Sequence, residues 1–481
     1  MNAIYSVLTS PWFYWVFLVV YFITIIGIAG VIVSENRNPL KSLAWVTVLF
    51  LFPIGGVILY IFFGRSIKNT AMISRRNKRR LRNAESADPK VIEQPSHLPS
   101  RLRQQVKLAR SLTGGNYYRG NSVEIFNNGT DKFKALIQDL KKAHSYIHIQ
   151  YYIFNDDEIG TQVAEVLKER ARAGVRVRVI YDDIGSIHVK KRFFKEMREA
   201  GIDVHPFFRV AFPPFATRIN WRNHRKLCII DGETGYIGGM NIADRYIDGG
   251  KQFDKWRDLH LRIKGPALNA LQYSFAVDWN FMGQPLIEES VTSECVPEQG
   301  AGIQMITSGP TSRWSNVAMV FLKAIAGAKK RVYIQTPYFL PTESLLKTLQ
   351  AAALSNVDVR IMIPRKSDSL ILTNASLSYV SECIRAGIKI YLYNGGMLHS
   401  KAMIVDDEFS TVGSTNFDFR SFEHNFEGNV LIYSKDVNAR LCRIFMDDLA
   451  ESIRIRASQW RRRPAWQKAK ESIVRLLSPI L

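Results

Sequence analysis

Cysteine is scarce in this chain, which has four among 481 residues. They are Cys228, Cys295, Cys383 and Cys442, and no two of them form a Cys-x-x-Cys pair. No cluster of cysteine and histidine has the spacing of a zinc site either. The chain is therefore neither a disulfide-stapled scaffold nor a zinc protein, and scattered thiols fit a reducing compartment. Cys228 lies in an apolar run, which favours a small buried hydrophobic residue over a catalytic thiol.

Acidic residues are also in short supply. Aspartate and glutamate total 43 against 65 lysines and arginines, which gives a formal net charge of +22. Such an excess indicates an anionic partner, such as nucleic acid, an acidic lipid or a phosphorylated substrate. The length exceeds that of one ordinary domain, so we expect two or three folded units.

Long apolar runs are missing from most of the chain and are confined to its first 65 residues. Residues 11–33 and 43–64 are almost wholly apolar, and each run exceeds the roughly 20 residues that a helix needs to cross a bilayer. A cleaved signal peptide fits the first run poorly, since no basic segment precedes it. We expect a transmembrane helical hairpin over residues 1–65, with a pair of buried soluble helices as the alternative.

The charges that flank these runs predict the orientation of the hairpin. Residues 65–82 carry eight basic side chains and no acidic one, whereas the link between the runs is nearly balanced. By the positive-inside rule, the chain is a multi-pass protein of the cell membrane whose large C-terminal part is cytoplasmic. The basic run also suits binding to anionic headgroups. We expect residues 66–115 to be a basic juxtamembrane segment and linker, because residues 84–102 are polar and contain three prolines.

The rest of the chain contains an internal repeat. Residues 143–154 and 328–339 both run through β-branched and aromatic residues to an Ile-Gln pair. In each copy a helical pattern follows, then a strand, a helix that ends at glycine and another strand. Such units form a mixed or parallel sheet covered by helices. We therefore expect an α/β fold with two tandem α/β/α repeats, over residues 116–290 and 291–481, packed about a pseudo-two-fold axis.

One motif occurs twice with the same spacing. The stretches "HRKLCIID" and "HSKAMIVD" both read His-x-Lys, four residues and Asp, and a Gly-[Gly/Ser]-x-Asn block completes each. Read as strands, they place histidine and lysine on one face, two residues apart. A single copy would occur by chance in many chains, but two copies within a longer repeat are a specific signal. The motif residues are His224, Lys226, Asp231, Gly239 and Asn241 in the first copy, and His399, Lys401, Asp406, Ser414 and Asn416 in the second.

The side chains of this motif suit a phosphate group. Lysine repels a metal cation, and one histidine without neighbouring carboxylates is no metal-ligand set, so we expect no metal. Lysine and asparagine donate to phosphate oxygens, and glycine or serine lets the backbone approach a ligand. If the repeats face each other, two imidazoles flank one phosphorus, and one attacks while the other transfers protons. The expected phosphate contacts are Asn241, Asn416, Gly239 and Ser414.

Further carboxylates are expected to support this chemistry. Each imidazole needs an acceptor on its second ring nitrogen, and Asp258 and Glu427 start β-like runs downstream of the two motifs. Asp231 and Asp406 follow the motif strands, and we expect them to support the lysines or the turn rather than to react.

These motifs resemble those of the phospholipase D superfamily. The stretches "YYIFNDDEIG", "YDDIGS", "WRDLHLRIKGP" and "PYFLP", with both motif blocks and the N-terminal hairpin, resemble bacterial cardiolipin synthases over nearly the whole chain. The resemblance implies two phospholipase D-like repeats and phosphatidyl transfer between two phosphatidylglycerol molecules, which forms cardiolipin and releases glycerol without a cofactor. Carried over to this sequence, His224 forms a phosphatidyl-histidine and His399 acts as acid and base. Gly239 departs from the serine that many members have at this position.

Other functions stay open from the sequence. A membrane-anchored phospholipase D, phosphodiesterase or nuclease would use the same two histidines. No interleaving of aromatic and basic residues marks a nucleic-acid groove, so the expected partners are phosphatidylglycerol, other anionic phospholipids and the membrane, and not nucleic acid. A non-enzymatic lipid-binding scaffold would leave the doubled motif unexplained. A homo-oligomer is also left open.

The C-terminal segment has a basic amphipathic pattern. Trp466, Ala469, Ile473 and Leu477 share one helical face, and most of the charged residues lie off it. An interfacial helix and an ordinary helix packed on the domain explain this pattern equally well.

Overall fold

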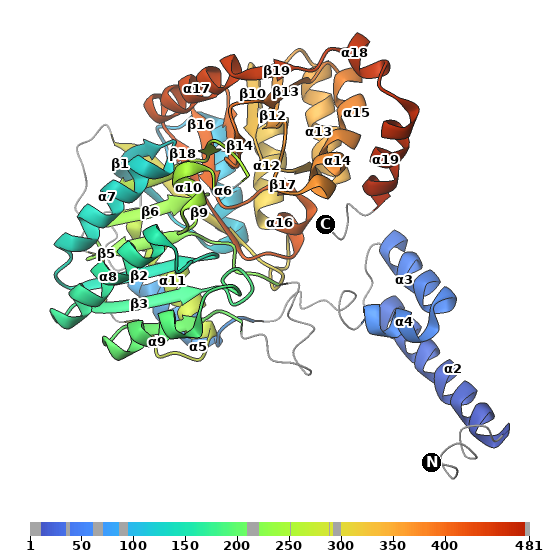
Figure 1. The fold of residues 1–481 in the computed structure, drawn as a ribbon. Helices are drawn as coiled ribbons and strands as arrows, with labels where there is room; N and C mark the ends of the chain where they lie inside the picture. Colours follow the sequence, from blue (N-terminus) through green and yellow to red (C-terminus); the bar gives the residue numbers. More distant parts are fainter. Residues whose placement is uncertain are drawn as a thin grey trace. The chain divides into compact units, whose positions relative to one another are not determined.

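The computed structural model describes residues 11–34, 39–60, 71–85, 95–208, 221–250, 252–287, 289–291 and 300–476. The chain divides into two compact units, one of residues 1–67 and 210–220 and one of residues 68–209 and 221–481. Figure 1 shows their helices and strands. The second unit contains both copies of the doubled motif.

The apolar N-terminus forms α2 (Pro11–Ser34), α3 (Pro39–Leu51) and α4 (Pro53–Leu59). The expectation of one helix over residues 43–64 is wrong, because the chain breaks at Phe52, whose ψ is 76°. Pro53 is the cause, since its ring disfavours the helical conformation in the residue before it. Residues 61–64 lie outside the described residues.

Many apolar side chains of these helices are exposed. In α2, Trp12, Trp15, Phe22 and Ile26 are each at least 55% exposed. Among the described residues, however, no helix combines the length and the apolar character that a membrane crossing requires. The expected transmembrane hairpin is therefore not confirmed.

The second unit is built on one mixed sheet of 15 strands. The first half of the chain supplies β1 (Tyr117–Phe126), β2 (Tyr146–Tyr151), β3 (Arg176–Tyr181), β4 (Asp203–Pro206), β5 (Leu227–Ile230), β6 (Thr234–Gly238) and β8 (His260–Lys264). The second half supplies β9 (Ala301–Ser308), β10 (Arg331–Gln335), β12 (Asp358–Pro364), β13 (Lys389–Tyr393), β15 (Ala402–Val405), β16 (Phe409–Gly413), β18 (Glu427–Tyr433) and β19 (Ser452–Arg454). Short strands form two further pairs, β7 (Trp256–Arg257) with β14 (Met397–Leu398) and β11 (Phe339–Leu340) with β17 (Phe417–Asp418).

The two halves of the sheet have the same strand order. Read outwards from the centre, it is β1-β8-β6-β5-β2-β3-β4 on one side and β9-β18-β16-β15-β10-β12-β13 on the other, with β19 at the edge. The three strands β2, β3 and β4 are parallel, and so are β10, β12 and β13. At the centre β1 and β9 pair antiparallel, with Tyr118 opposite Ile303. The predicted α/β fold with a mixed sheet is confirmed.

Helices pack on both halves of this sheet (Figure 1). Four of the longer ones begin at a polar residue whose side chain accepts a backbone N–H of the first turn, namely Asn128, Asp157, Thr342 and Ser434. Each half of the sheet has its own apolar core. The first half carries α7 (Gly129–Lys142), α8 (Glu158–Arg172), α9 (Lys191–Glu199), α10 (Arg245–Asp248) and α11 (Leu268–Phe281). The second half carries α12 (Asn316–Ala326), α13 (Glu343–Leu354), α14 (Leu370–Ser378), α15 (Val380–Arg385), α16 (Phe419–Glu423), α17 (Lys435–Ala450), α18 (Ala457–Arg461) and α19 (Ala465–Leu476).

The expected linker contains two helices, α5 (Arg75–Glu85) and α6 (Ser100–Thr113). On α6, Leu102, Val106 and Ala109 recur at helical spacing and enter the core of the second half. The basic α5 packs against α11. Residues 86–94 between the two helices lie outside the described residues. Both helices thus belong to the second unit, and the expectation of a plain linker is wrong for them.

The C-terminal helix α19 packs on α14 and keeps its apolar face open. Trp466 and Ile473 are 69% and 64% exposed. Glu471 is buried and accepts a hydrogen bond from Arg463 at 2.9 Å. The helix is thus packed on the second unit, the interfacial role stays a prediction, and Leu477 lies outside the described residues.

Candidate active site

The two motifs lie directly before corresponding strands. β5 and β15 each begin after the motif lysine, so histidine and lysine occupy the extended segment that leads into the strand rather than the strand itself. Lys226 and Lys401 are only 1% and 2% exposed. The expected alternation holds, because the intervening Arg225 turns away to bind Asp278.

Hydrogen bonds between the two repeats hold both histidines by their backbone. The N–H of His224 donates to the carbonyl oxygen of Phe426 at 2.9 Å, and the N–H of His399 donates to that of Arg257 at 2.7 Å. In both cases the acceptor residue directly precedes one of the carboxylates that were expected to orient the histidines. Each motif histidine is thereby placed beside a carboxylate of the other repeat.

The two histidine–carboxylate pairs are exchanged between the repeats. Nδ1 of His224 lies 3.0 Å from Oε1 of Glu427, and Nδ1 of His399 lies 2.6 Å from Oδ2 of Asp258. Both carboxylates are fully buried. An acceptor at Nδ1 holds the proton on that nitrogen and leaves Nε2 free for a substrate. The sequence predicted these partners but not their exchange.

Burial and positive neighbours lower the pKa of both histidines. For His224, desolvation is the largest cause, the charges of Lys226 and Lys401 add to it, and Glu427 opposes it. Desolvation and Lys401 hold the pKa of His399 well below its ordinary value, and Lys226 and His224 contribute. Since the lysine of each motif acts on the histidine of the other, the two motifs form one electrostatic site.

The two lysines make this site favour an anion. Desolvation holds the pKa of Lys226 well below its ordinary value and lowers that of Lys401 to about 8. Nζ of Lys226 donates to the carbonyl oxygen of His224 at 2.6 Å, and Nζ of Lys401 lies 3.1 Å from Nε2 of His399. A phosphate between them would favour both charged forms. The described residues include no group of three or more His, Cys, Asp or Glu that could hold a metal.

Gly239 and Ser414 occupy the same position in the two motif blocks. Gly239 lies beside Asp258, and Ser414 lies beside Glu427. Beside Glu427, the hydroxyl of Ser414 donates to Oε2. Burial raises the pKa of Glu427, but His224, Lys226 and the Ser414 hydrogen bond together bring it below its ordinary value. Glu427 is therefore held as an anion.

The other half of the site has no such hydroxyl. A Cβ at Gly239 would lie 2.1 Å from Oδ1 of Asp258, so glycine alone fits beside that carboxyl. Burial raises the pKa of Asp258 to about 6, in spite of Lys401 and the N–H of Leu259. The difference between Gly239 and Ser414 thus accompanies a difference in pKa between the two carboxylates.

The two motif asparagines are not equivalent. Asn241 accepts the N–H of Ile153 at 3.1 Å and donates to the hydroxyl of Tyr246, so its amide braces the first repeat. Asn416 is 6% exposed, and its Oδ1 has no hydrogen-bond partner among the described residues. Oδ1 is an acceptor, as a phosphate oxygen is, so the phosphate contact of Asn416 stays a prediction, and the amide of Asn241 already contacts Ile153 and Tyr246.

The motif aspartates support turns at the far ends of the motif strands. Asp231 and Asp406 have φ of 54° and 51°, in the left-handed region that aspartate tolerates. Their carboxylates accept backbone N–H groups of the segments that lead into β2 and β10. These donors are His144, Ser145 and Tyr146 for the first, and Lys329, Lys330 and Arg331 for the second. Of the two roles expected for them, these contacts show support of the turn.

Aromatic rings that the sequence did not single out line the histidines. The ring centroid of Tyr152 lies 5.1 Å from that of His224, and those of Trp256 and Tyr246 lie 5.2 and 5.9 Å from that of His399. Such rings exclude water and strengthen the electrostatics of the site. Trp256 stands two residues before Asp258 in the quoted "WRD", which was a usable signal.

A second missed feature lies behind the site. In each half, the glutamine of the repeated Ile-Gln pair donates to a buried aspartate that also binds an arginine next to a site residue. One group is Gln150, Asp278 and Arg225, all of the first repeat, and the other joins Gln335 and Asp448 of the second repeat to Arg257 of the first. The recurrence of Ile-Gln in the sequence was the signal for this arrangement.

Comparisons with known proteins identify the family of the two repeats. A family model described as "Cardiolipin synthase, PLD-like domain" matches residues 136–279 and 321–449, once in each half of the sheet. A model described as "Phospholipase_D-nuclease N-terminal" matches residues 15–65. The crystal structure of phosphatidylserine synthase from Haemophilus influenzae Rd KW20 covers 79% of this chain and all of its own, at a TM-score of 0.59 and 12% identity, which shows the fold alone.

Sequence relatives narrow the class further. The "Major cardiolipin synthase ClsA" of Bacillus subtilis is 39% identical over 464 residues, 94% of this chain and 96% of its own. "Cardiolipin synthase 2" of Bacillus anthracis is 37% identical over 463 residues, 94% of this chain and 89% of its own. Fold and site define a phospholipase D-like enzyme with paired motifs. The chain belongs to the cardiolipin synthase family of these enzymes. It is a phosphatidyltransferase that acts on phospholipids and is associated with the membrane.

Proposed function

We propose that this synthase transfers a phosphatidyl group from one phosphatidylglycerol to another through a phosphatidyl-histidine, which gives cardiolipin and glycerol. The exchanged histidine–carboxylate pairs carry the proposal, because they hold two imidazoles from different repeats around one anion-binding site. The equal strand orders of the two halves support a pseudo-two-fold axis through this site. Such an axis suits a displacement in which attack and departure occur on opposite sides of the phosphorus.

The first step forms the covalent intermediate. Nε2 of His224 attacks the phosphorus of the first phosphatidylglycerol, and the bond from phosphorus to the headgroup glycerol oxygen breaks. His399, protonated at Nε2 while the anionic substrate is bound, gives its proton to that oxygen, and glycerol leaves. Lys226 and Lys401 stabilise the negative charge on the remaining phosphate oxygens.

The second step reverses these roles on a new substrate. A hydroxyl of the second phosphatidylglycerol headgroup gives its proton to Nε2 of His399, and its oxygen attacks the phosphorus. The P–N bond breaks, His224 is neutral again and His399 is again protonated. The products contain every atom of the two substrates, so the reaction needs no further reactant.

The charges of the two carboxylates support this division of roles. An anionic Glu427 stabilises the positive ring that His224 becomes when Nε2 binds phosphorus. Asp258, whose pKa burial raises to about 6, gives His399 less support as a cation. His399 also has the more strongly lowered pKa, which makes it the better proton donor of the two.

Product analysis separates this reaction from hydrolysis, which is the alternative. Purified protein in detergent micelles, with phosphatidylglycerol as the only phospholipid, is expected to release one glycerol for each four-chain lipid formed. Phosphatidic acid as the only phospholipid product would show that water is the acceptor, and would overturn the transferase proposal. Inactivity of His224→Ala and His399→Ala in the same assay would show that this site carries out the reaction, whether transfer or hydrolysis.

We also propose that the N-terminal unit anchors the chain in the cell membrane and that the second unit is cytoplasmic. The exposed apolar side chains of α2 support an apolar cover, because exposed apolar surface costs about 25 cal/mol per Å² in water. The basic α5 and the open apolar face of α19 would suit an anionic bilayer surface. The chain is expected to stay with membranes washed at alkaline pH, and its second unit to be cleaved by protease only in inverted vesicles. Release by the wash, or cleavage in right-side-out vesicles, would contradict this placement.

A further inference from the structure

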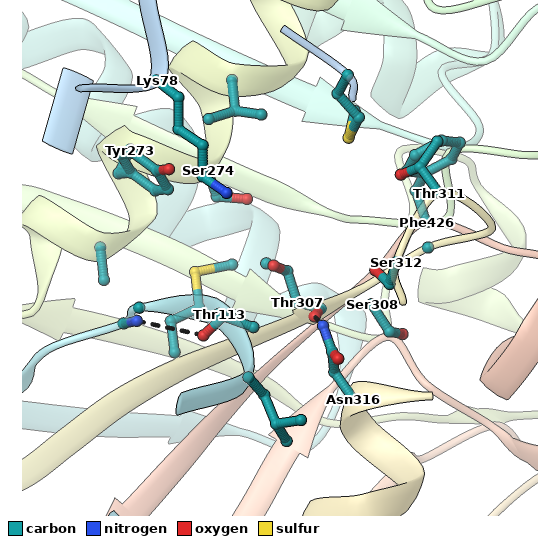
Figure 2. A pocket seen from close by; sticks show the side chains of 18 of the residues that line it. Lys78, Thr113, Tyr273, Ser274, Thr307, Ser308, Thr311, Ser312, Asn316 and Phe426 are labelled. Atoms are coloured by element: carbon teal, nitrogen blue, oxygen red, sulfur yellow. Dashed lines mark hydrogen bonds between the residues drawn. The ribbon is translucent and has the colours of Figure 1, made fainter. Parts of the chain in front are cut away.

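A cavity of about 580 Å³ lies in the second unit, away from the two histidines. Its walls come from α11, β9, the end of α6, the segment 309–316 and the chain that leads into and along α5 (Figure 2). Neither a motif histidine nor a motif lysine lines it, nor does Asp258 or Glu427. Arg225 and Phe426 do, so the cavity lies behind the segments that carry His224 and Glu427. It is therefore a separate site.

Contacts between α5 and α11 build one wall. Arg82 lies over the ring of Tyr273, with its guanidinium carbon 3.9 Å from the centroid. The same guanidinium donates to the carbonyl oxygen of Thr113 at 2.7 Å and pairs with Glu85. Asn77 donates to Oδ1 of Asn280 at 3.0 Å. The basic α5 is thus a fixed part of the cavity.

The charges of the lining residues leave a surplus of positive charge. Arg82 and Arg225 are balanced by Glu85 and Asp278. The remaining cations of the lining are Lys78, Arg110 and Arg313, and the structure gives none of the three an ion-pair partner within its described part. Glu85 is the one acidic residue among the described lining residues. An anion would therefore be attracted into the cavity.

Two buried serine hydroxyls lie in the wall of the cavity. Ser274 and Ser308 are 4% and 2% exposed, and neither Oγ has a hydrogen-bond partner within the described residues. Figure 2 shows both among the side chains that line the cavity, together with Lys78. A buried hydroxyl without a partner is unfavourable, and a bound acceptor removes this cost. The oxygens of a phosphate are such acceptors.

Part of the lining is apolar. Ile73, Tyr273, Val277, Met305 and Phe426 contribute to it. A free inorganic anion would leave this surface unused, whereas the glycerol backbone and first acyl carbons of a phospholipid would cover it. The combination of cations, free hydroxyls and apolar surface fits an amphiphile with a phosphate.

We propose that this cavity binds the phosphate of an anionic phospholipid at a site where no transfer takes place. Lys78 and Arg313 pair with the phosphate, Ser274 and Ser308 donate to its oxygens, and the apolar residues contact the lipid beyond it. The site adds a point of attachment to an acidic membrane next to α5. It is independent of which histidine attacks.

Photocrosslinking tests the proposal directly. The probe is phosphatidylglycerol with a diazirine on the first carbons of one acyl chain, in detergent micelles with the full chain. Irradiation is expected to label peptides that contain Tyr273, also in the variant that combines His224→Ala and His399→Ala. Lys78→Gln with Arg313→Gln is expected to lower this labelling about tenfold. The matched control is Lys134→Gln with Arg456→Gln, which removes the same charge from exposed sites outside the cavity and leaves labelling unchanged.

Competition identifies the source of the phosphate. Unlabelled dihexanoyl-phosphatidylglycerol is expected to displace the probe at concentrations at least tenfold below those of inorganic phosphate or glycerophosphoglycerol. Equal potency of inorganic phosphate would overturn the lipid as ligand. Absent labelling of these peptides, or equal labelling of both charge variants, would overturn the site. Glycerol release by the Lys78/Arg313 variant is expected to stay within twofold of the parent, so failure here is separable from failure of the proposed reaction.

Discussion

The two halves of the active site differ most in the carboxylate that each gives to the other. Glu427 receives a hydroxyl hydrogen bond from Ser414 and has a lowered pKa, whereas Asp258 lies against Gly239 and has a pKa of about 6. The strand order and the backbone bonds that hold the histidines are otherwise the same. The doubled motif therefore forms two similar half-sites, whose carboxylates differ in pKa. One histidine is better supported as a cation, and the other is better suited to release a proton.

The largest effect is expected from removing either histidine. His224→Ala and His399→Ala should each lower the rate of glycerol release at least about 10⁴-fold, since one removes the nucleophile and the other the proton donor. The measurement is the initial rate with phosphatidylglycerol in micelles, with the thermal midpoint as a control for folding. Substantial turnover by either variant would refute the two-histidine mechanism.

Exchanging the carboxylates for amides should separate the two halves. Glu427→Gln is expected to lower kcat about 10³-fold and Asp258→Asn about 10²-fold, because the anion beside the developing cation contributes more. The parent enzyme should also lose kcat/KM as the pH falls through about 6, where Asp258 takes up a proton. This acid limb should be absent from the pH profile of kcat/KM for Asp258→Asn. Equal losses of kcat for both variants would mean that the two carboxylates stabilise the transition state equally.

Removing the hydroxyl of Ser414 makes the halves more similar. Ser414→Ala should raise the pKa of Glu427, because a hydrogen bond that lowers it is lost. The expected result is a loss of about tenfold in kcat. The acid limb that Glu427 contributes to kcat/KM, which lies below the one at about pH 6 from Asp258, should move to higher pH than in the parent. Ser410→Ala, another fully buried serine in the second half, is the matched control. An unchanged profile would show that Ser414 does not distinguish the halves.

The motif aspartates should affect folding and not chemistry. Asp231→Ala leaves three backbone N–H groups without their carboxylate, which should lower the free energy of unfolding by about 2–4 kcal/mol. Chemical denaturation measures this loss. The turnover of the folded fraction should stay within about threefold of the parent, since the carboxylate does not reach the substrate. A loss of turnover without a loss of stability would show that Asp231 takes part in catalysis.

Spacing and alternation were enough to predict the motif residues and both supporting carboxylates. These features are local, because side chains two residues apart in an extended chain share a face. The exchange of Asp258 and Glu427 is not local. It depends on hydrogen bonds from His224 to Phe426 and from His399 to Arg257, which join segments far apart in the sequence. Only the structure of the paired repeats shows this exchange of carboxylates.

Other parts of the sequence were interpreted too simply. Pro53 was visible within the second apolar run and was a sufficient sign of a break before it. The basic residues of α5 predicted a charged linker. In the structure, Arg82 and Asn77 instead hold this helix against α11. The amide of Asn241 could have contacted phosphate on its motif position alone, but the hydroxyl of Tyr246 occupies it. In each case a tertiary contact outweighed the local pattern.

The most direct test of the mechanism is to trap the covalent intermediate. In His399→Ala, glycerol departs without its proton donor and the second substrate lacks its base, so the phosphatidyl adduct should be slow to form and slower to resolve. Denaturation at alkaline pH after incubation with labelled phosphatidylglycerol, followed by peptide mass spectrometry, should place the adduct on His224. His224→Ala should give no adduct. An adduct on His399 in the parent enzyme, or none on either histidine while turnover continues, would contradict the account.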